Sequence, residues 1–190
     1  MMSRMDALKV LYTYTENIPV ISSCGNTSRE WASLGRRDNH LYMVDTMGLT
    51  PSVAIGVSLA IEDSGFKKCI GIEGDGGVLM NPNSLASASY LQPEKWLLIV
   101  FDNGCFGSTG GQTSFASKID IAGVARGFQL ETLAVDNLED FEKAVVTGLE
   151  AEGPFVIHAK INQENHKATF INDDPAVLAY KFSSFIEGEK

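Results

Sequence analysis

The stretch Cys69-Ile70-Gly71-Ile72-Glu73-Gly74-Asp75-Gly76 decides how this chain folds. It begins as a short apolar run and ends in a Gly-Asp-Gly turn. A second apolar run, Trp96 to Phe101, ends at Asp102-Asn103-Gly104. Continuous apolar runs of this length are typical of strands that are buried on both faces of a parallel sheet. Twenty-five residues separate Gly76 from Asp102, which is room for one helix and one strand. The two runs are therefore expected to form one βαβ unit.

The rest of the chain continues the same alternation of strands and helices. Further strands are expected at 17–23, 41–44, 129–135 and 155–161, and helices at 5–15, 52–62, 84–91, 138–151 and 175–186. Thr50-Pro51 and Asn81-Pro82 are each expected to cap and start a helix. A βαβα order predicts an α/β, doubly wound parallel sheet in three layers, with ligands at the carboxyl ends of the strands.

Composition limits the function classes. The length of 190 residues fits a single domain over 1–190, with a polar and then helical tail from about residue 162. A net charge of -9 argues against nucleic acid as a partner, and no apolar run is long enough to span a membrane, so a cytoplasmic protein is expected. Three cysteines without a CxxC pair, and three scattered histidines, predict neither a disulfide framework nor a zinc site.

Asp75 and Asn103 are the strongest candidates in the sequence for a metal-binding site. Alone, Gly-Asp-Gly at a strand end is explained by a tight turn and a helix cap. A βαβ unit, however, brings Asp75 and Asn103 to the ends of two strands, where they can share an ion. A carboxylate, an amide oxygen and a backbone carbonyl are hard ligands that suit Mg²⁺ or Ca²⁺, with phosphate oxygens and water completing the octahedron.

These residues resemble the signature of the enzymes that depend on thiamin diphosphate, in which GDG is followed after 25 to 30 residues by NN or DN. The flanking segments Tyr42 to Leu49 and Asp102 to Gln112 are similar to the sulfopyruvate and phosphonopyruvate decarboxylases, and the resemblance covers about residues 1 to 160. It implies the thiamin diphosphate-binding fold. It also implies Mg²⁺ bound by Asp75, the Asn103 side chain and the backbone carbonyl of Cys105.

The resemblance also implies how the cofactor is held. The diphosphate would meet the metal and the backbone N–H groups of Gly76, Gly77, Phe106 and Gly107. Gly25 and Asn26 occupy a further diphosphate-binding position, although a turn and helix cap explain them equally well. Met47 matches the apolar residue that holds the cofactor bent, and the backbone at Asp45 and Met47 would hold its aminopyrimidine; a methionine is otherwise most often a gap-filler in a core.

Other candidates have weaker support. The loop Ser108 to Gln112 is a solvated turn by composition, or it closes over substrate, with Gln112 or Lys118 meeting an acidic head group. His158 is expected to be a hydrogen-bonded core residue and His166 to be exposed. Nothing basic is adjacent to Cys105 in the sequence to make it a thiolate.

The resemblance implies a thiamin diphosphate-dependent decarboxylase of 2-oxo acids with an acidic head group. It is most like the beta subunit that converts sulfopyruvate to sulfoacetaldehyde and CO₂. In similar enzymes a Glu on a separate pyrimidine-binding domain activates the cofactor, and this chain has one βα series only. An alpha subunit in a hetero-oligomer is therefore expected to supply that Glu, and Glu73 is not assigned the role. The alternatives are a phosphonopyruvate decarboxylase subunit and a catalytically silent cofactor-binding module; a Rossmann site is disfavoured, because no G-x-G-x-x-G follows the first strand.

Overall fold

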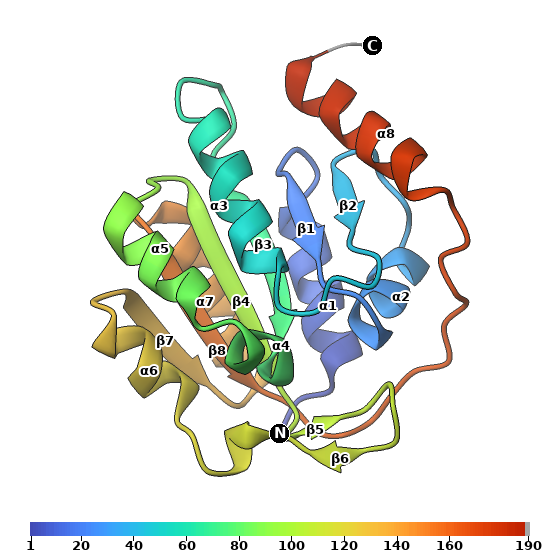
Figure 1. The fold of residues 1–190 in the computed structure, drawn as a ribbon, viewed down its shortest axis with the longest axis vertical. Coiled ribbons are helices and arrows are strands. Elements are labelled where there is room, and N and C mark those ends of the chain that lie inside the picture. Colours follow the sequence, from blue (N-terminus) through green and yellow to red (C-terminus); the bar gives the residue numbers. More distant parts are fainter. Residues whose placement is uncertain (189–190) are drawn as a thin grey trace.

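Six strands pair into one sheet in the order β2-β1-β3-β4-β8-β7, and every pairing is parallel (Figure 1). The computed structural model describes residues 1–188. Its strands are β1 Val20–Ser22, β2 His40–Tyr42, β3 Cys69–Gly74, β4 Trp96–Asp102, β7 Glu131–Val135 and β8 Phe155–Lys160. The two runs that suggested the fold, β3 and β4, lie side by side at its centre, and both are buried. The predicted doubly wound α/β sheet is confirmed.

Helices cover both faces of the sheet and make three layers. One core joins the sheet to α1 (Arg4–Tyr14), α2 (Asn26–Ser33) and α7 (Leu138–Glu150). A second core, on the opposite face, joins it to α3 (Thr50–Ala60), α5 (Asn83–Leu91) and α6 (Ile121–Gly127). Successive residues of a strand point to opposite faces, so β4 sends Leu97 and Ile99 into the first core and Leu98 and Val100 into the second.

Short elements at the carboxyl edge of the sheet were not predicted in this form. The helix α4 (Asp75–Met80) follows β3 directly. The loop Ser108 to Gln112 contains an exposed turn, as one of its two readings predicted, and this turn joins the unpredicted short strands β5 (Cys105–Phe106) and β6 (Gln112–Thr113) into a small hairpin; the 3₁₀ turn η1 (Phe115–Ser117) follows. Each of the two predicted caps was wrong by one residue. Leu49 precedes α3, so Thr50 is its first residue, and Asn81 ends α4, while Pro82 precedes α5.

The segment after β8 runs back along the molecule to a last helix. Residues 162–174 form no regular element, and α8 (Pro175–Glu187) follows (Figure 1). This helix buries Leu178 and Phe182 against the chain's own two cores. No helix among residues 1–188 has the length and apolarity that a membrane crossing requires.

Candidate functional site

The register of β3 and β4 brings the two central candidates together. Gly74 pairs with Phe101, so Asp75 and Asn103 each leave the carboxyl end of one of two neighbouring strands. A cavity of about 90 Å³ opens there. Nine of the predicted site residues line it, from four separate segments of the chain: Asn26, Met47, Asp75, Gly76, Gly77, Asn103, Cys105, Phe106 and Gly107. Residues far apart in the sequence thus meet at one edge of the sheet.

Asp75 is one of two acidic residues that line this cavity. It is the first residue of α4 and is buried. The Ser114 hydroxyl donates a hydrogen bond to Asp75 Oδ2, and no other residue is hydrogen-bonded to its side chain among residues 1–188. Burial raises the pKa of Asp75, and the nearby Asp102 carboxylate adds to the rise. A buried carboxylate with one oxygen without a partner is a group that a divalent cation would stabilise.

The loop after β4 supplies neutral oxygen atoms. Asn103 Oδ1 accepts a hydrogen bond from the backbone N–H of Cys105 at 3.1 Å, which holds the amide in place and leaves the second lone pair of its oxygen. Ser114 N–H donates to Gly104 O across the hairpin. In an antiparallel pair, backbone groups of successive residues point alternately toward and away from the partner strand, so the carbonyl of Cys105 points away from β6. Asp75, Asn103 and Cys105, the three residues predicted as metal ligands, all line one cavity.

Close packing leaves no room for a side chain at Gly76 or Gly77. A Cβ on Gly76 would lie 2.2 Å from Cε1 of the Phe106 ring, and one on Gly77 would lie 2.4 Å from Oε1 of Glu73. Both glycines belong to the first turn of α4, whose N–H groups have no acceptor within the helix. Phe106 itself pairs with Gln112 in the hairpin and contributes its ring to the cavity wall.

Glu73 is a buried acid on the same wall. Its Oε1 accepts a hydrogen bond from Gly74 N–H at 2.9 Å, while Oε2 is buried without any partner among residues 1–188. Burial raises the pKa of this carboxyl group. Because Asp75 and Glu73 are both acidic, an anion such as a diphosphate would enter this cavity only together with a cation. The donor set and the acidic wall fit a diphosphate held through Mg²⁺.

The loop between β2 and α3 carries Met47 to the mouth of the cavity. Met47 is 39% exposed, which is unusual for a core gap-filler. Asn81 Nδ2 donates to Gly48 O at 3.0 Å and fastens the loop to α4. Gly48 has φ +82°, and a Cβ there would lie 2.8 Å from Gly77 O, so only glycine fits. Asp45, also at positive φ (49°), lies outside this cavity.

Two predicted residues line a neighbouring cavity. Gly25 and Asp45 border a space of about 250 Å³, which shares Cys24 with the first cavity. Gly25 precedes α2 with φ +89°, a conformation that favours glycine. The turn that was one of the two readings of Gly25 is therefore present. Asn26, in contrast, lies in the first cavity.

Sequence reasoning missed a basic group in this cavity. Arg4, at the start of α1, lines it and is paired with Glu30 of α2. The Arg4 guanidinium also works against the rise in the pKa of the Cys105 thiol that burial and Asp75 cause, although the net shift is upward. A basic residue is thus close to Cys105 after all, but it does not make the thiol reactive. Nothing in the sequence links residues 4 and 30.

Several weaker candidates lie elsewhere. Gln112 is exposed and hydrogen-bonded to Thr109, Lys118 is exposed, and neither lines the cavity. His158 is buried, and its Nε2 lies 2.8 Å from Asp102 Oδ2, although its Nδ1 has no partner among residues 1–188. His166 is exposed, as predicted. The described residues contain no group of three or more His, Cys, Asp or Glu side chains able to hold a metal ion, so a metal here would need amide, carbonyl and ligand oxygens.

Comparisons with known proteins identify the family of this chain. Residues 24–159 match the family described as "Thiamine pyrophosphate enzyme, C-terminal TPP binding domain". Sulfopyruvate decarboxylase subunit beta of Methanocaldococcus jannaschii is 35% identical over 186 residues, with 97% of each chain covered. Phosphonopyruvate decarboxylase of Streptomyces viridochromogenes is 33% identical over 192 residues, which cover 97% of this chain and 46% of that protein.

Solved structures show the same fold. Benzoylformate decarboxylase from Polynucleobacter necessarius has a TM-score of 0.74 at 18% identity, over 85% of this chain and 33% of the other. A 4-hydroxybenzoylformate decarboxylase from Rhodococcus jostii RHA1 has a TM-score of 0.73 at 21% identity, over 86% of this chain and again 33% of the other. The chain thus spans about a third of these solved proteins. With its match over residues 24–159 and its relatives along nearly the whole length, the chain belongs to the thiamine pyrophosphate enzymes, in the family that includes the sulfopyruvate decarboxylase beta subunits.

Proposed function

We propose that this chain is the diphosphate-binding, or beta, subunit of a thiamin diphosphate-dependent 2-oxo acid decarboxylase. The observation that carries the proposal is the pairing of Gly74 with Phe101, which brings Asp75 and Asn103 to one cavity. In this function, Asp75, Asn103 Oδ1 and the Cys105 carbonyl bind Mg²⁺. The bound cofactor would supply an electron sink for the electron pair that remains when the C–C bond to the carboxylate breaks and CO₂ leaves.

The remaining cavity residues would hold and shape the cofactor. The first-turn N–H groups at Gly76 and Gly77 face the anion, together with the backbone at Phe106 and Gly107 and the side chain of Asn26. Met47 projects an apolar side chain at the cavity mouth, where it would press the cofactor into a bent shape, with the backbone at Asp45 and Met47 beside the aminopyrimidine. Gly25 contributes the turn that places Asn26. Glu73, which lies in β3 on the diphosphate side of the cavity, is not assigned as the activating Glu; by the resemblance, that Glu would come from the partner chain.

The size of the cavity supports a site shared with a second chain. Pockets that enclose ligands of cofactor size measure about 300–1,000 Å³. The first cavity has about 90 Å³, which suits a metal and a diphosphate, and the adjoining one, lined by Gly25 and Asp45, has about 250 Å³, so each is smaller than such a pocket. We therefore assign the rest of the pocket to a pyrimidine-binding alpha subunit, with residues 1–190 forming one diphosphate-binding domain of the hetero-oligomer.

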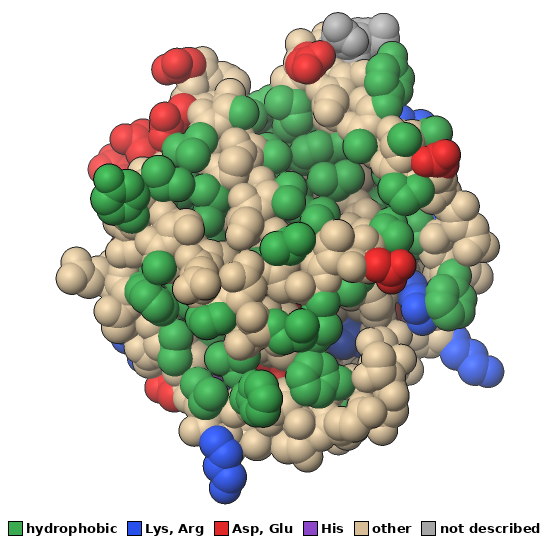
Figure 2. Space-filling view, viewed as in Figure 1, with side chains coloured by type: hydrophobic (Ala, Val, Ile, Leu, Met, Phe, Trp, Pro, Cys, Tyr) green, Lys and Arg blue, Asp and Glu red, His purple; other side chains and the backbone are tan. Residues whose placement is uncertain are grey.

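The surface near the cavity is suited to such a partner. Neither α3 nor α5 contains a charged residue, although 21% of the chain is charged. Figure 2 shows hydrophobic side chains over the face that carries α3, α4 and α5, with charged side chains mostly toward its rim. The large apolar residues exposed on these elements and on the loop that carries Met47 are Val44, Met47, Leu49, Leu59, Met80, Tyr90 and Leu91. A patch of this kind, poor in charge and next to a half-open site, is typical of a subunit interface.

The substrate proposed is sulfopyruvate, which would yield sulfoacetaldehyde and CO₂. The support is the identity, over nearly the full length, to proteins named sulfopyruvate decarboxylase subunit beta. Phosphonopyruvate is the second candidate, because a phosphonopyruvate decarboxylase is nearly as similar over the same span. Both substrates are 2-oxo acids with a tetrahedral oxyanion as the head group.

The test is a substrate panel on the chain co-purified with its pyrimidine-domain partner. CO₂ release from sulfopyruvate, phosphonopyruvate and pyruvate is measured with thiamin diphosphate and Mg²⁺ present. We expect sulfopyruvate to give the highest kcat/KM, and Asp75→Asn to abolish turnover, while Asp63→Asn, an exposed acid beyond the end of α3, leaves it unchanged. Cofactor binding without turnover on any of the three would contradict the decarboxylase and support a silent module.

A further inference from the structure

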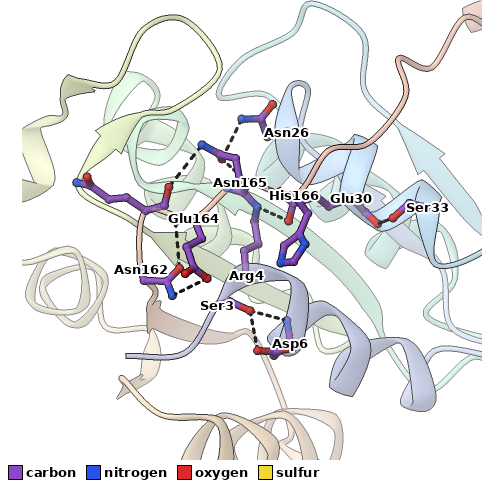
Figure 3. Close-up of polar contacts among 11 residues, drawn as sticks. Ser3, Arg4, Asp6, Asn26, Glu30, Ser33, Asn162, Glu164, Asn165 and His166 are labelled. Atoms are coloured by element: carbon purple, nitrogen blue, oxygen red, sulfur yellow. Dashed lines mark hydrogen bonds and ion pairs between the residues drawn. The ribbon is translucent and has the colours of Figure 1, made fainter.

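A buried ion pair lies at the edge of the cavity. Arg4 is 5% exposed and Glu30 is fully buried. The guanidinium donates through Nε to Glu30 Oε2 at 3.0 Å and through Nη2 to Glu30 Oε1 at 2.6 Å. Figure 3 shows Arg4 rising from the start of α1 toward α2 and the segment after β8. The pair therefore has a fixed, two-point geometry.

The segment that follows β8 fastens this pair from the other side. Asn165 Oδ1 accepts hydrogen bonds from Arg4 Nη2 at 2.8 Å and from Asn26 Nδ2 at 3.0 Å, and the backbone N–H of His166 donates to Glu30 Oε1 at 3.1 Å (Figure 3). These contacts occupy Nε and Nη2 of the guanidinium. Its Nη1 group makes no hydrogen bond to any residue in 1–188, and Arg4 lines the cavity. The Nη1 group of a rigidly held cation is thus left for a ligand.

Fold stability alone is a poor explanation for this arrangement. Two buried charges cost desolvation energy, and well-packed apolar residues of similar size are often as stable or more stable. An arginine that is held through Nε and Nη2 can, however, still donate through its Nη1 group to a phosphate oxygen. The cavity also needs positive charge, because Asp75 and Glu73 face it and the whole chain carries a net charge of -9.

We propose that Arg4 binds the terminal phosphate of the cofactor's diphosphate through Nη1, and that Glu30 and Asn165 are positioning residues for it. The inference rests on the proposed function and adds a protein cation to the metal. The proposed substrates also carry a tetrahedral oxyanion as the head group, so Nη1 of Arg4 could bind either this head group or the terminal phosphate of the cofactor. The diphosphate is favoured over the substrate's head group, because Asn165 lies against Gly107: a Cβ on Gly107 would be 3.4 Å from the amide atoms of Asn165. Gly107 follows the loop that carries the proposed metal ligands Asn103 and Cys105, so Arg4 is fastened near the metal.

The test compares two ligands that differ by the terminal phosphate. Calorimetry measures the binding of thiamin diphosphate and of thiamin monophosphate, with Mg²⁺ in excess, to the chain co-purified with its partner. Because Arg4→Met alone would leave Glu30 buried and unpaired, the main variant is the double substitution Arg4→Met with Glu30→Met. Arg4→Lys is the second variant, since it keeps a charge beside Glu30 but loses the fork. Lys67→Met, just before β3 at the opposite edge of the sheet, is the control for net charge.

We expect the double variant to bind thiamin diphosphate about 10- to 100-fold more weakly, as for a lost charge-assisted hydrogen bond, and to bind the monophosphate as before. Arg4→Lys should show a smaller loss, again confined to the diphosphate, and Lys67→Met none. Unchanged diphosphate affinity in both variants, an equal loss for both ligands, or a loss seen only in the KM for substrate would overturn the role of Arg4 and leave the proposed function standing. Failure of the wild-type complex to bind the cofactor at all would overturn both.

Discussion

His40 provides a pH-dependent test of the scaffold that holds the cavity. It begins β2 and is 3% exposed, with its ring 4.8 Å from Trp31 of α2 and 5.9 Å from Tyr12 of α1, measured between centroids. Its Nε2 is buried without a partner among residues 1–188. Burial, with a smaller effect of the Arg37 charge, lowers the pKa of His40 from 6.5 to about 3. This aromatic cluster packs together α1 and α2, the helices that carry Arg4, Asn26 and Glu30.

The magnitude follows from the difference in pKa between the two states. As the pH falls from 7 to 5, the unfolded chain takes up a proton on His40 and the folded chain does not. The pKa is depressed by folding, so the stability is present above pH 6.5 and is lost progressively toward pH 3. With an unfolded pKa of 6.5, the free energy of unfolding falls by about 2 kcal/mol between pH 7 and pH 5 through this one residue.

The assay is urea unfolding at pH 7 and pH 5 for the wild type and His40→Phe, which keeps an aromatic ring but cannot titrate. The drop in unfolding free energy between the two pH values should be about 2 kcal/mol smaller in His40→Phe, because the substitution removes this one proton-linked contribution. His166→Phe, at an exposed position, serves as the matched control and should match the wild type. An equal drop in His40→Phe and wild type would refute the assignment of a buried neutral His40.

Three further predictions concern the cavity itself. Asp75→Ala should weaken Mg²⁺-dependent binding of thiamin diphosphate by about 100-fold or more, because it removes a charged metal ligand; an unchanged affinity in calorimetry would contradict this role. Met47→Ala should lower kcat more than cofactor affinity, because the side chain shapes a bound cofactor more than it retains one; normal kcat would reduce Met47 to a packing residue. Gly76→Ala should destabilise the fold by about 1–3 kcal/mol through the clash with Phe106, and Phe106→Leu should relieve much of that loss in urea unfolding; no rescue would mean that the clash is not the cause.

The central part of the fold could be predicted because its signals are local. The apolar runs of β3 and β4 are uninterrupted, and the spacing between them allows one crossover, which is enough to place Asp75 beside Asn103. The short α6 was missed, because Gly123 and Gly127 weaken its helical pattern and only tertiary packing on the sheet stabilises it. The β5–β6 hairpin was missed for a similar reason, since each strand has only two residues.

The basic side of the cavity could not be predicted, because it depends on long-range contacts. Arg4 and Glu30 are 26 positions apart, and Asn165 is 161 positions from Arg4. No pattern in the sequence connects three segments that meet only after the sheet has formed. The burial of Glu73 also depends on long-range packing, and its position in the sequence gives no sign that its Oε2 has no hydrogen-bond partner among residues 1–188.

The most direct test of the account is decarboxylation by this chain with and without the proposed alpha subunit. The chain is purified alone and as the co-purified complex, and CO₂ release from sulfopyruvate is followed with saturating thiamin diphosphate and Mg²⁺. We expect turnover by the complex and none by the isolated chain, because the activating Glu and the rest of the cofactor pocket are assigned to the alpha subunit. Robust turnover by the isolated chain would contradict the shared site.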